Sequence, residues 1–213
     1  MGVVTLRIAR GSGLADYDVE SAEGMTVLDA LELIRHLREP GMRYRHSCHH
    51  GSCGTCGVLI DGKERLLCVT RLPAQGVITI EPLRKVGLIG DLAVDPGAFF
   101  LEMPAGAGYL RPSRTGREGA FQMDACIECG ICVSACPVTG PFVGPAALAA
   151  VDTDREADRG KEAAALDFAA GPRGVDACAS HFACSRACPQ GVAPGRRIAA
   201  LRRSLAERSS GKT

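Results

Sequence analysis

The sequence predicts an α+β protein of two domains, a mixed domain over residues 1–104 and an all-helical domain over residues 105–213. Apolar and polar residues alternate like β-strands in the first part, around one stretch with helical period. After residue 144, alanine and leucine recur at helical spacing. Between these parts, "PAGAGYLRPSRTGREGAFQ" is rich in Gly, Pro and Arg and follows neither period, so the domain boundary is expected near it. A chain of 213 residues suits two domains of about 100 residues each.

The first elements are two strands and a helix. "VVTLRIA" and "ADYDVE" alternate as half-buried strands. Thr26 is the expected cap of the helix, which Pro40 and Gly41 terminate. Its apolar residues share one face and are expected to be core: Val27, Leu28, Leu31, Ile34 and Leu37.

The later elements complete this pattern. "GVLIDGKERLLC" reads as a hairpin with Asp61-Gly62 at its turn, and "GVITIEP" supplies another strand. The first domain is therefore a sheet packed on a helix, with the loop "CHHGSCGTCG" at its edge. In the second part, residues 144–171 and 194–210 read as helices, with Gly160 and Gly171 as breaks or caps. The arginine pairs at 196–197 and 202–203 are expected on the solvated face of the last helix, where a partner subunit could use them.

Charge and hydropathy exclude several classes of function. The 25 basic and 24 acidic residues nearly cancel, so nothing favours nucleic acid or anionic lipid as a partner. The start of the sequence lacks the order of a secretory signal, and Gly and Pro interrupt every apolar run, so we expect a soluble, cytosolic chain. In such a chain the 11 cysteines indicate metal sites rather than disulfides.

The first cysteine group is Cys48, Cys53 and Cys56, followed by Cys68. C-x4-C-x2-C with a later fourth cysteine is the spacing of plant-type [2Fe–2S] centres. A four-cysteine zinc site is the alternative, but it usually takes two separated C-x2-C pairs. His46, His49 and His50 raise the possibility of a Rieske centre; because four cysteines already serve two irons, we interpret these histidines as solvated loop residues.

The second group, "CIECGICVSACP", is the full bacterial run C-x2-C-x2-C-x3-C-P. In two-cluster ferredoxins the fourth cysteine of such a run serves the other cluster. By this crossed pattern Cys188, which precedes Pro189, completes a [4Fe–4S] centre. The expected ligands of this centre are Cys126, Cys129, Cys132 and Cys188.

The crossed pattern leaves Cys136, Cys178 and Cys184 for a last centre. The stretch "CASHFACSRACP" places His181 where a bacterial run would have its middle cysteine. The motif can be damaged, can use a histidine ligand, or can hold a different cluster.

The whole arrangement resembles the iron–sulfur subunit of succinate dehydrogenase and fumarate reductase. The stretches "RHSCHHGSCGTCG", "LIGDLAVDPGAFF", "FVGPAALAA" and "ACPQGVAPGRRIA" look like their counterparts in that family, in the same order over residues 3 to 207. The resemblance implies a β-grasp [2Fe–2S] ferredoxin domain followed by a bacterial-ferredoxin-like two-cluster domain. It also implies a partner subunit with covalent FAD, where succinate and fumarate interconvert, and membrane anchor subunits that hold a quinone at the inner face of the cell membrane. The chain itself would have no substrate site.

The resemblance makes the last centre a [3Fe–4S] cluster with a non-ligand at position 181. His181 then tunes the cluster or moves protons without binding iron, and Pro137 is a second candidate on the quinone side. The chain departs from the family there, because it has no tryptophan and carries Ala179 after Cys178. An electron-transfer subunit of a soluble, non-quinone flavoprotein reductase, for example one linked to thiols or ferredoxin, is the alternative. A zinc-binding or metal-storage module is the third hypothesis.

Overall fold

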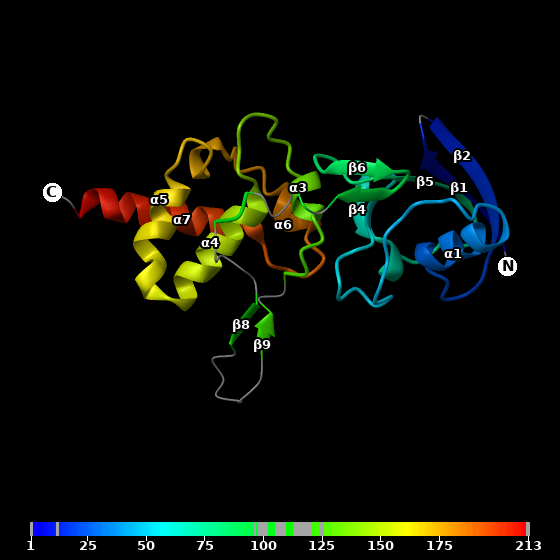
Figure 1. Cartoon of the computed structure of the whole chain (residues 1–213), viewed down its shortest axis with the longest axis horizontal. Helices are drawn as coiled ribbons and strands as arrows, with labels where there is room; N and C mark the ends of the chain where they lie inside the picture. The colour runs from blue at the N-terminus through cyan, green and yellow to red at the C-terminus, as the bar shows by residue number, and fades with distance from the viewer. Residues whose placement is uncertain are drawn as a thin grey trace. The chain divides into compact units, whose positions relative to one another are not determined.

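The computed structural model describes residues 2–11, 13–95, 97, 102–104, 110–112, 121–123 and 126–211, with the backbone alone at 110–112 and 121–123. The chain forms two compact units (Figure 1). The first is Met1–Pro96 together with Glu128–Ser134, and the second is Gly97–Ile127 together with Ala135–Thr213. Most of the 104–122 segment, where the domain boundary is expected, lies outside the described residues.

The first unit is built on a five-stranded sheet of order β2-β1-β5-β3-β4. β1 pairs antiparallel with β2 and parallel with β5, while β3 pairs antiparallel with β5 and β4. The parallel pair requires a crossover, and helix α1 lies within it. The bounds are β1 Gly2–Arg10, β2 Gly13–Ser21, α1 Val27–Leu37, β3 Gly57–Ile60, β4 Lys63–Leu66 and β5 Gly76–Glu81.

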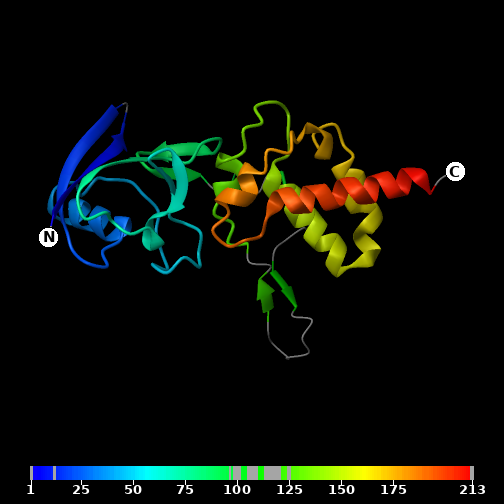
Figure 2. The ribbon, with the colours of Figure 1, turned by 180° about the vertical axis from the view of Figure 1, so that it is seen from behind.

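Helix α1 covers one face of this sheet, as Figure 2 shows from behind. Thr26 caps it with a capping box: Thr26 Oγ1 accepts from Asp29 N at 3.2 Å, and Asp29 Oδ2 accepts from Thr26 N at 2.8 Å. The predicted helix, its cap and most of its core face are confirmed. The prediction for Leu37 is wrong, since its side chain is 68 % exposed. Leu37 is the last helical residue, and periodicity gives the direction of a side chain, not whether an element lies opposite.

The hairpin of β3 and β4 is also confirmed. Asp61 (φ 50°) and Gly62 (φ 73°) occupy its two-residue turn, which requires positive φ at both positions. Cys68 lies in the short 3₁₀ helix η1, Leu67–Val69, directly after β4. The sequence did not indicate the small antiparallel pair β6, Gly87–Gly90, and β7, Ala93–Asp95.

A short segment of the second cysteine group packs in the first unit. It contains α3, Ile131–Ser134. Ser134 Oγ donates to Glu64 Oε1 at 3.0 Å and accepts from Arg84 N at 3.0 Å. A Cβ on Gly57 would lie only 3.1 Å from the carbonyl oxygen of Cys129, so the segment approaches β3 closely. Glycine at position 57 permits this approach.

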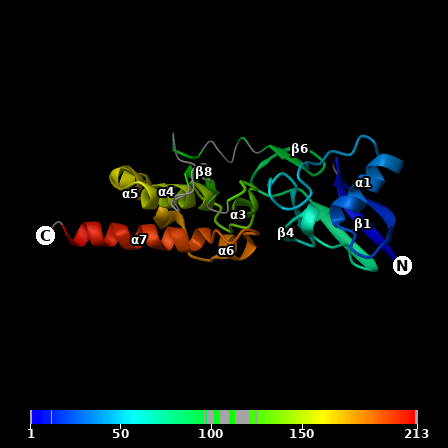
Figure 3. The same cartoon turned by 90° about the horizontal axis from the view of Figure 1, so that it is seen from below.

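The second unit is mainly helical. Its elements are α4 Pro145–Ala157, η2 Arg159–Lys161, α5 Glu162–Ala169, η3 Val175–Ala177, α6 Ala183–Ala187 and α7 Pro194–Ser210. α4 and α5 pack on α7 (Figure 3). The expected breaks at Gly160 and Gly171 are confirmed, because η2 separates α4 from α5 and Gly171 follows α5. Two short strands, β8 Leu110–Pro112 and β9 Phe121–Met123, pair antiparallel in the segment expected to be irregular.

The core of the second unit fixes α7. Its buried side chains are Leu148, Leu166, Ala169, Val175, Ile198 and Leu201. The expectation that both arginine pairs of α7 are solvated is wrong for one member of each pair. Arg197 lies 3.4 Å from Asp152, whose side chain is fully buried, and Arg202 bonds to backbone carbonyls.

No helix among the described residues is long and apolar enough to cross a bilayer.

Candidate iron–sulfur centres

The loop that carries Cys48 and Cys53 wraps its backbone around the Cys48 sulfur. Ser52 N and Cys53 N donate to Cys48 Sγ at 3.2 and 3.3 Å, and Cys48 N donates to Cys53 Sγ at 3.5 Å. Gly51 (φ 79°) and Gly54 (φ 71°) take left-handed conformations that let the loop turn this tightly. Amide donors stabilise the negative charge of a thiolate and of a cluster that it binds.

Cys56 and Cys68 form a second, more deeply buried pair. Their Sγ atoms are 3.4 Å apart, and the side chains are 3 % and 5 % exposed. Two thiolates bound at about 2.3 Å to one tetrahedral metal lie about 3.8 Å apart, so this pair fits the ligands of one iron. Among the described residues no three metal-binding side chains converge on one point. The four thiols of this site come in two pairs, and this donor set fits a two-iron cluster.

Cys48 and Cys56, one from each pair, differ in the pKa of their thiols. Hydrogen bonding, first from the backbone N–H of His50, lowers the pKa of Cys48 to about 6. Burial raises the pKa of Cys56 to about 12. Metal ligation requires the thiolate, so Cys48 is prepared to bind iron at neutral pH, whereas Cys56 loses its proton only as the metal binds.

The histidines near this loop have different surroundings. His49 and His50 are exposed, as expected. The interpretation of His46 as a solvated residue is wrong: its Nδ1 is 2.9 Å from His49 Nε2, and its Nε2 is 3.3 Å from Glu32 Oε1. Glu32 of α1 also accepts a hydrogen bond from Tyr44 Oη at 2.5 Å, so Glu32 links the side chains of His46 and Tyr44 to the helix.

The second cysteine group is divided between the two compact units. Cys129 and Cys132 belong to the first unit, and Cys126 and Cys136 to the second. Glu128 (φ 54°) and Gly130 (φ 76°) provide two left-handed turns between the first cysteines of the run. The assignment of Cys188 to the same cluster as Cys126, Cys129 and Cys132 stays a prediction.

The third group is brought together inside the second unit. Burial raises the pKa of Cys184, and the nearby Cys136 and Cys178 raise it further through charge repulsion. Three thiols close enough to interact in this way suit the binding of one cluster, since the metal removes the repulsion. Cys178 Sγ also accepts from Ser180 N at 3.4 Å.

The structure places His181 and Pro137 at the surface. Both are exposed, and the His181 carbonyl accepts from Arg186 Nη1 at 2.9 Å. Ser180 (φ 56°) and Phe182 (φ 56°) flank it in left-handed conformations. The roles of both residues stay predictions.

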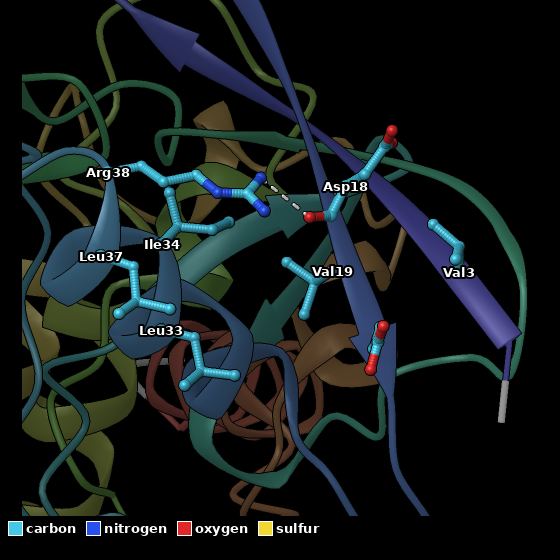
Figure 4. Close-up of a pocket in the computed structure, with 8 residues that line it drawn as sticks. Val3, Asp18, Val19, Leu33, Ile34, Leu37 and Arg38 are labelled. Atoms are coloured by element: carbon cyan, nitrogen blue, oxygen red, sulfur yellow. Dashed lines mark hydrogen bonds between the residues drawn. The ribbon is translucent and has the colours of Figure 1, made fainter.

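One groove in the first unit is unrelated to the cysteines. It has a volume of about 460 Å³ and lies between α1 and β2 (Figure 4). Leu33 and Leu37 line it from the helix, and Arg38 Nη1 donates to the Asp18 carbonyl at 2.9 Å. Its lining contains no cysteine and no group suited to redox chemistry.

Comparisons with known proteins cover both parts of the chain. Residues 8–101 match the model of the 2Fe-2S iron-sulfur cluster binding domain, and residues 122–192 match that of the 4Fe-4S dicluster domain. The fumarate reductase iron-sulfur subunit of Wolinella succinogenes is 31 % identical, over 89 % of this chain and 88 % of its own. The succinate dehydrogenase iron-sulfur subunit of Coxiella burnetii is 30 % identical, over 92 % and 91 %.

The chain belongs to the family of iron–sulfur subunits of succinate dehydrogenase and fumarate reductase. A chain in the structure of the Mycobacterium smegmatis Sdh1 complex in the apo form agrees, with a TM-score of 0.79 and 25 % identity over 97 % of this chain and 96 % of its own. The predicted family and fold class are confirmed, as are domains for [2Fe–2S] and [4Fe–4S] clusters. The chain is an electron-transfer subunit of an oxidoreductase.

Sequence reasoning about this iron–sulfur subunit missed the role of α7. Arg202 contacts the loop of Cys178, and Gly195 N donates to Ser185 Oγ, beside Cys184, at 2.8 Å. The signal was present, because Ile198, Leu201, Arg202 and Leu205 follow the i, i+3, i+4, i+7 pattern of one helix face. A charged residue on that apolar face indicates a buried partner.

Proposed function

We propose that this iron–sulfur subunit carries electrons between an FAD-containing partner subunit and a quinone. Its family supports this, and so does the presence of three separate cysteine groups with the ligand spacings of three centres. The bound clusters supply one-electron chemistry. The chain holds and insulates them and has no substrate site of its own.

We assign the ligands by group. Cys48, Cys53, Cys56 and Cys68 hold a [2Fe–2S] cluster. Cys126, Cys129, Cys132 and Cys188 hold a [4Fe–4S] cluster, and Cys136, Cys178 and Cys184 hold a [3Fe–4S] cluster. The placement of Cys136, Cys178 and Cys184 in one compact unit is the observation that supports a separate third centre most directly.

Each site protects its cluster in a different way. Cys56, directly before β3, and Cys68, within η1, are buried, while two backbone amides donate to Cys48 Sγ. At the third site Cys136 and Cys184 are buried, while Cys178 is only half-buried. Solvent exposure of the ligands is one of the factors that set the reduction potential of a cluster.

Purification of the native complex tests this function. The chain, tagged and isolated under anaerobic conditions, is expected to bring with it a flavoprotein with covalent flavin and membrane anchor subunits. The isolated chain is expected to reduce no dye with succinate, and such activity would sink the subunit hypothesis. A complex of this chain with a flavoprotein alone, free of membrane and quinone, would favour the alternative of a non-quinone reductase.

A further inference from the structure

The loop that carries Cys178 is held by one side chain of helix α7. Arg202 Nη2 donates to the Val175 carbonyl at 2.5 Å and also to the Cys178 carbonyl. Arg202 Nη1 donates to Ser180 Oγ at 2.5 Å. The rigid fork of a guanidinium can serve acceptors on two sides at once, whereas an ammonium group is a point charge on a flexible stem.

This contact restrains a backbone conformation that is unfavourable on its own. Ser180 has a φ of 56°, in the left-handed region that is unfavourable for a residue with a Cβ. In this conformation the Ser180 N–H donates to Cys178 Sγ at 3.4 Å. Because Arg202 holds both the hydroxyl of Ser180 and the carbonyl of Cys178, it fixes the amide that faces the sulfur.

Helix α7 is a rigid base for this arginine. Ile198 and Leu201, on the same face, are 1 % and 0 % exposed within the core of the second unit. At its start, a Cβ on Gly195 would come within 2.7 Å of the Phe182 ring, so the helix lies tightly against the other end of the cysteine loop. The backbone of Arg202 is therefore held in place by a packed core.

The contact places a positive charge and an oriented amide beside a sulfur ligand. The acceptors of Arg202 found among the described residues are two carbonyls and a hydroxyl, all of them neutral. Hydrogen bonds to ligand sulfurs and the local net charge are two of the means by which proteins set cluster potentials. The hydrogen bond from the Ser180 amide and the positive charge of Arg202 both stabilise the reduced cluster, because it carries one more negative charge than the oxidised cluster.

We propose that Arg202 is a positioning residue of the third centre: it holds the Val175–Ser180 loop so that the Ser180 amide faces Cys178 Sγ, and thereby raises the reduction potential. This inference rests on the proposed function, because it requires a cluster on Cys136, Cys178 and Cys184. It adds a residue of α7 to a site otherwise built from the cysteine loops.

A redox titration of the native complex, followed by the EPR signal of the third centre, tests the proposal. Arg202→Gln is expected to shift the ratio of reduced to oxidised centre at least tenfold toward the oxidised form, which is 59 mV for a one-electron couple. The matched control is Arg203→Gln, which removes the same charge from an exposed neighbour on α7 and is expected to shift the ratio less than twofold. Arg202→Lys is expected to fall between them, because it keeps the charge and loses the fork.

The outcomes separate this inference from the proposed function. A wild type without the three-iron signal contradicts the proposed function, whatever the variants do. A wild type with the signal and an Arg202→Gln complex that titrates like the wild type refutes the role of Arg202. If Arg202→Gln assembles no third centre, Arg202→Lys and Ser180→Ala decide: a lowered potential in either supports the proposal, and unchanged potentials in both overturn it.

Discussion

Cys48 and Cys56 belong to one predicted cluster yet lie at opposite extremes of thiol acidity. Backbone amides stabilise the thiolate of Cys48 and lower its pKa to about 6, while burial raises the pKa of Cys56 to about 12. Spacing predicts which cysteines form the group, but it contains no information on these differences. They depend on which backbone N–H groups the folded loop directs at each sulfur.

This contrast predicts the order of alkylation in the metal-free chain. Because the thiolate is the nucleophile and the pKa of Cys48 is lowered, its reaction with iodoacetamide should rise with pH around pH 6 and be complete first at pH 7.5. Cys56, with its raised pKa, should react much more slowly than Cys48. Mass spectrometry of peptides at several pH values measures this order, and Cys48→Ser should abolish the fast phase. Equal rates for Cys48 and Cys56 would contradict the described loop.

His181 gives a second prediction for a single residue. If the third centre has three irons because this position offers no thiolate, His181→Cys restores C-x2-C-x2-C and should allow a fourth iron to bind. The EPR signal of the oxidised centre should disappear, and a centre of lower potential should appear on reduction. His181→Ala is the control and should keep the three-iron signal. A wild type that lacks the three-iron signal and a His181→Ala variant that gains it would make His181 a ligand of a fourth iron.

Elements were predicted where local chemistry decides them, and missed where a distant partner decides. The cap at Thr26, the turn at Asp61-Gly62 and the interruption at Gly160 each depend on one or two residues, so the sequence shows them. The exposure of Leu37 and the contacts of Arg202 depend on what another element places opposite. The alternation of polar and apolar residues along one segment does not show which other element packs against it.

The helices of the second unit are joined by a buried ionic cluster that the sequence did not reveal. Asp152 of α4 is fully buried and accepts from Arg155 Nη2 at 2.8 Å. Arg197 of α7 lies 3.4 Å from the same carboxylate, and Arg155 Nη1 donates to Ser204 Oγ at 3.0 Å. One carboxylate thus connects α4 to the helix that supports Arg202.

Asp152→Asn should therefore destabilise the second unit. Removal of the buried carboxylate leaves Arg155 with only the partly exposed Glu162, and Arg197 with only the exposed Glu156, as ion-pair partners among the described residues. We therefore expect a cost at the lower end of the about 3–5 kcal/mol that breaking a buried ion pair costs. The control is Asp167→Asn, which breaks the exposed pair with Arg208 and should cost about 1 kcal/mol or less. Urea unfolding of the chain with its iron–sulfur clusters bound measures the free energy of unfolding of both variants. Equal unfolding midpoints for the two variants would show that the ion pairs of Asp152 do not hold the helices together.

At the scale of the whole molecule, the family and the cysteine groups were predictable because the motifs are dense and ordered. The division of the chain into two units was less predictable. Glu128–Ser134 packs with the first unit although it lies inside the second cysteine motif. The packing of Ser134 against Glu64 and of the Cys129 backbone against Gly57 leaves no pattern in the sequence.

Cys188→Ser tests the crossed assignment of ligands. Cys188 lies beside the third group in the sequence, but we assign it to the [4Fe–4S] centre. The variant should lose the EPR signal of the reduced [4Fe–4S] centre and keep the three-iron signal of the oxidised protein. Cys184→Ser should give the reverse. Loss of the three-iron signal alone in Cys188→Ser would exchange the two assignments.

The central claim is that the chain holds three different clusters in sequence, the last of them with three irons. EPR spectroscopy of the freshly purified native complex, first oxidised and then reduced in steps, tests it most directly. We expect one signal near the g-value of the free electron in the oxidised protein, and two further signals that appear on reduction as the [2Fe–2S] and [4Fe–4S] centres each take up an electron. An oxidised complex with full iron content and no such signal would contradict the account.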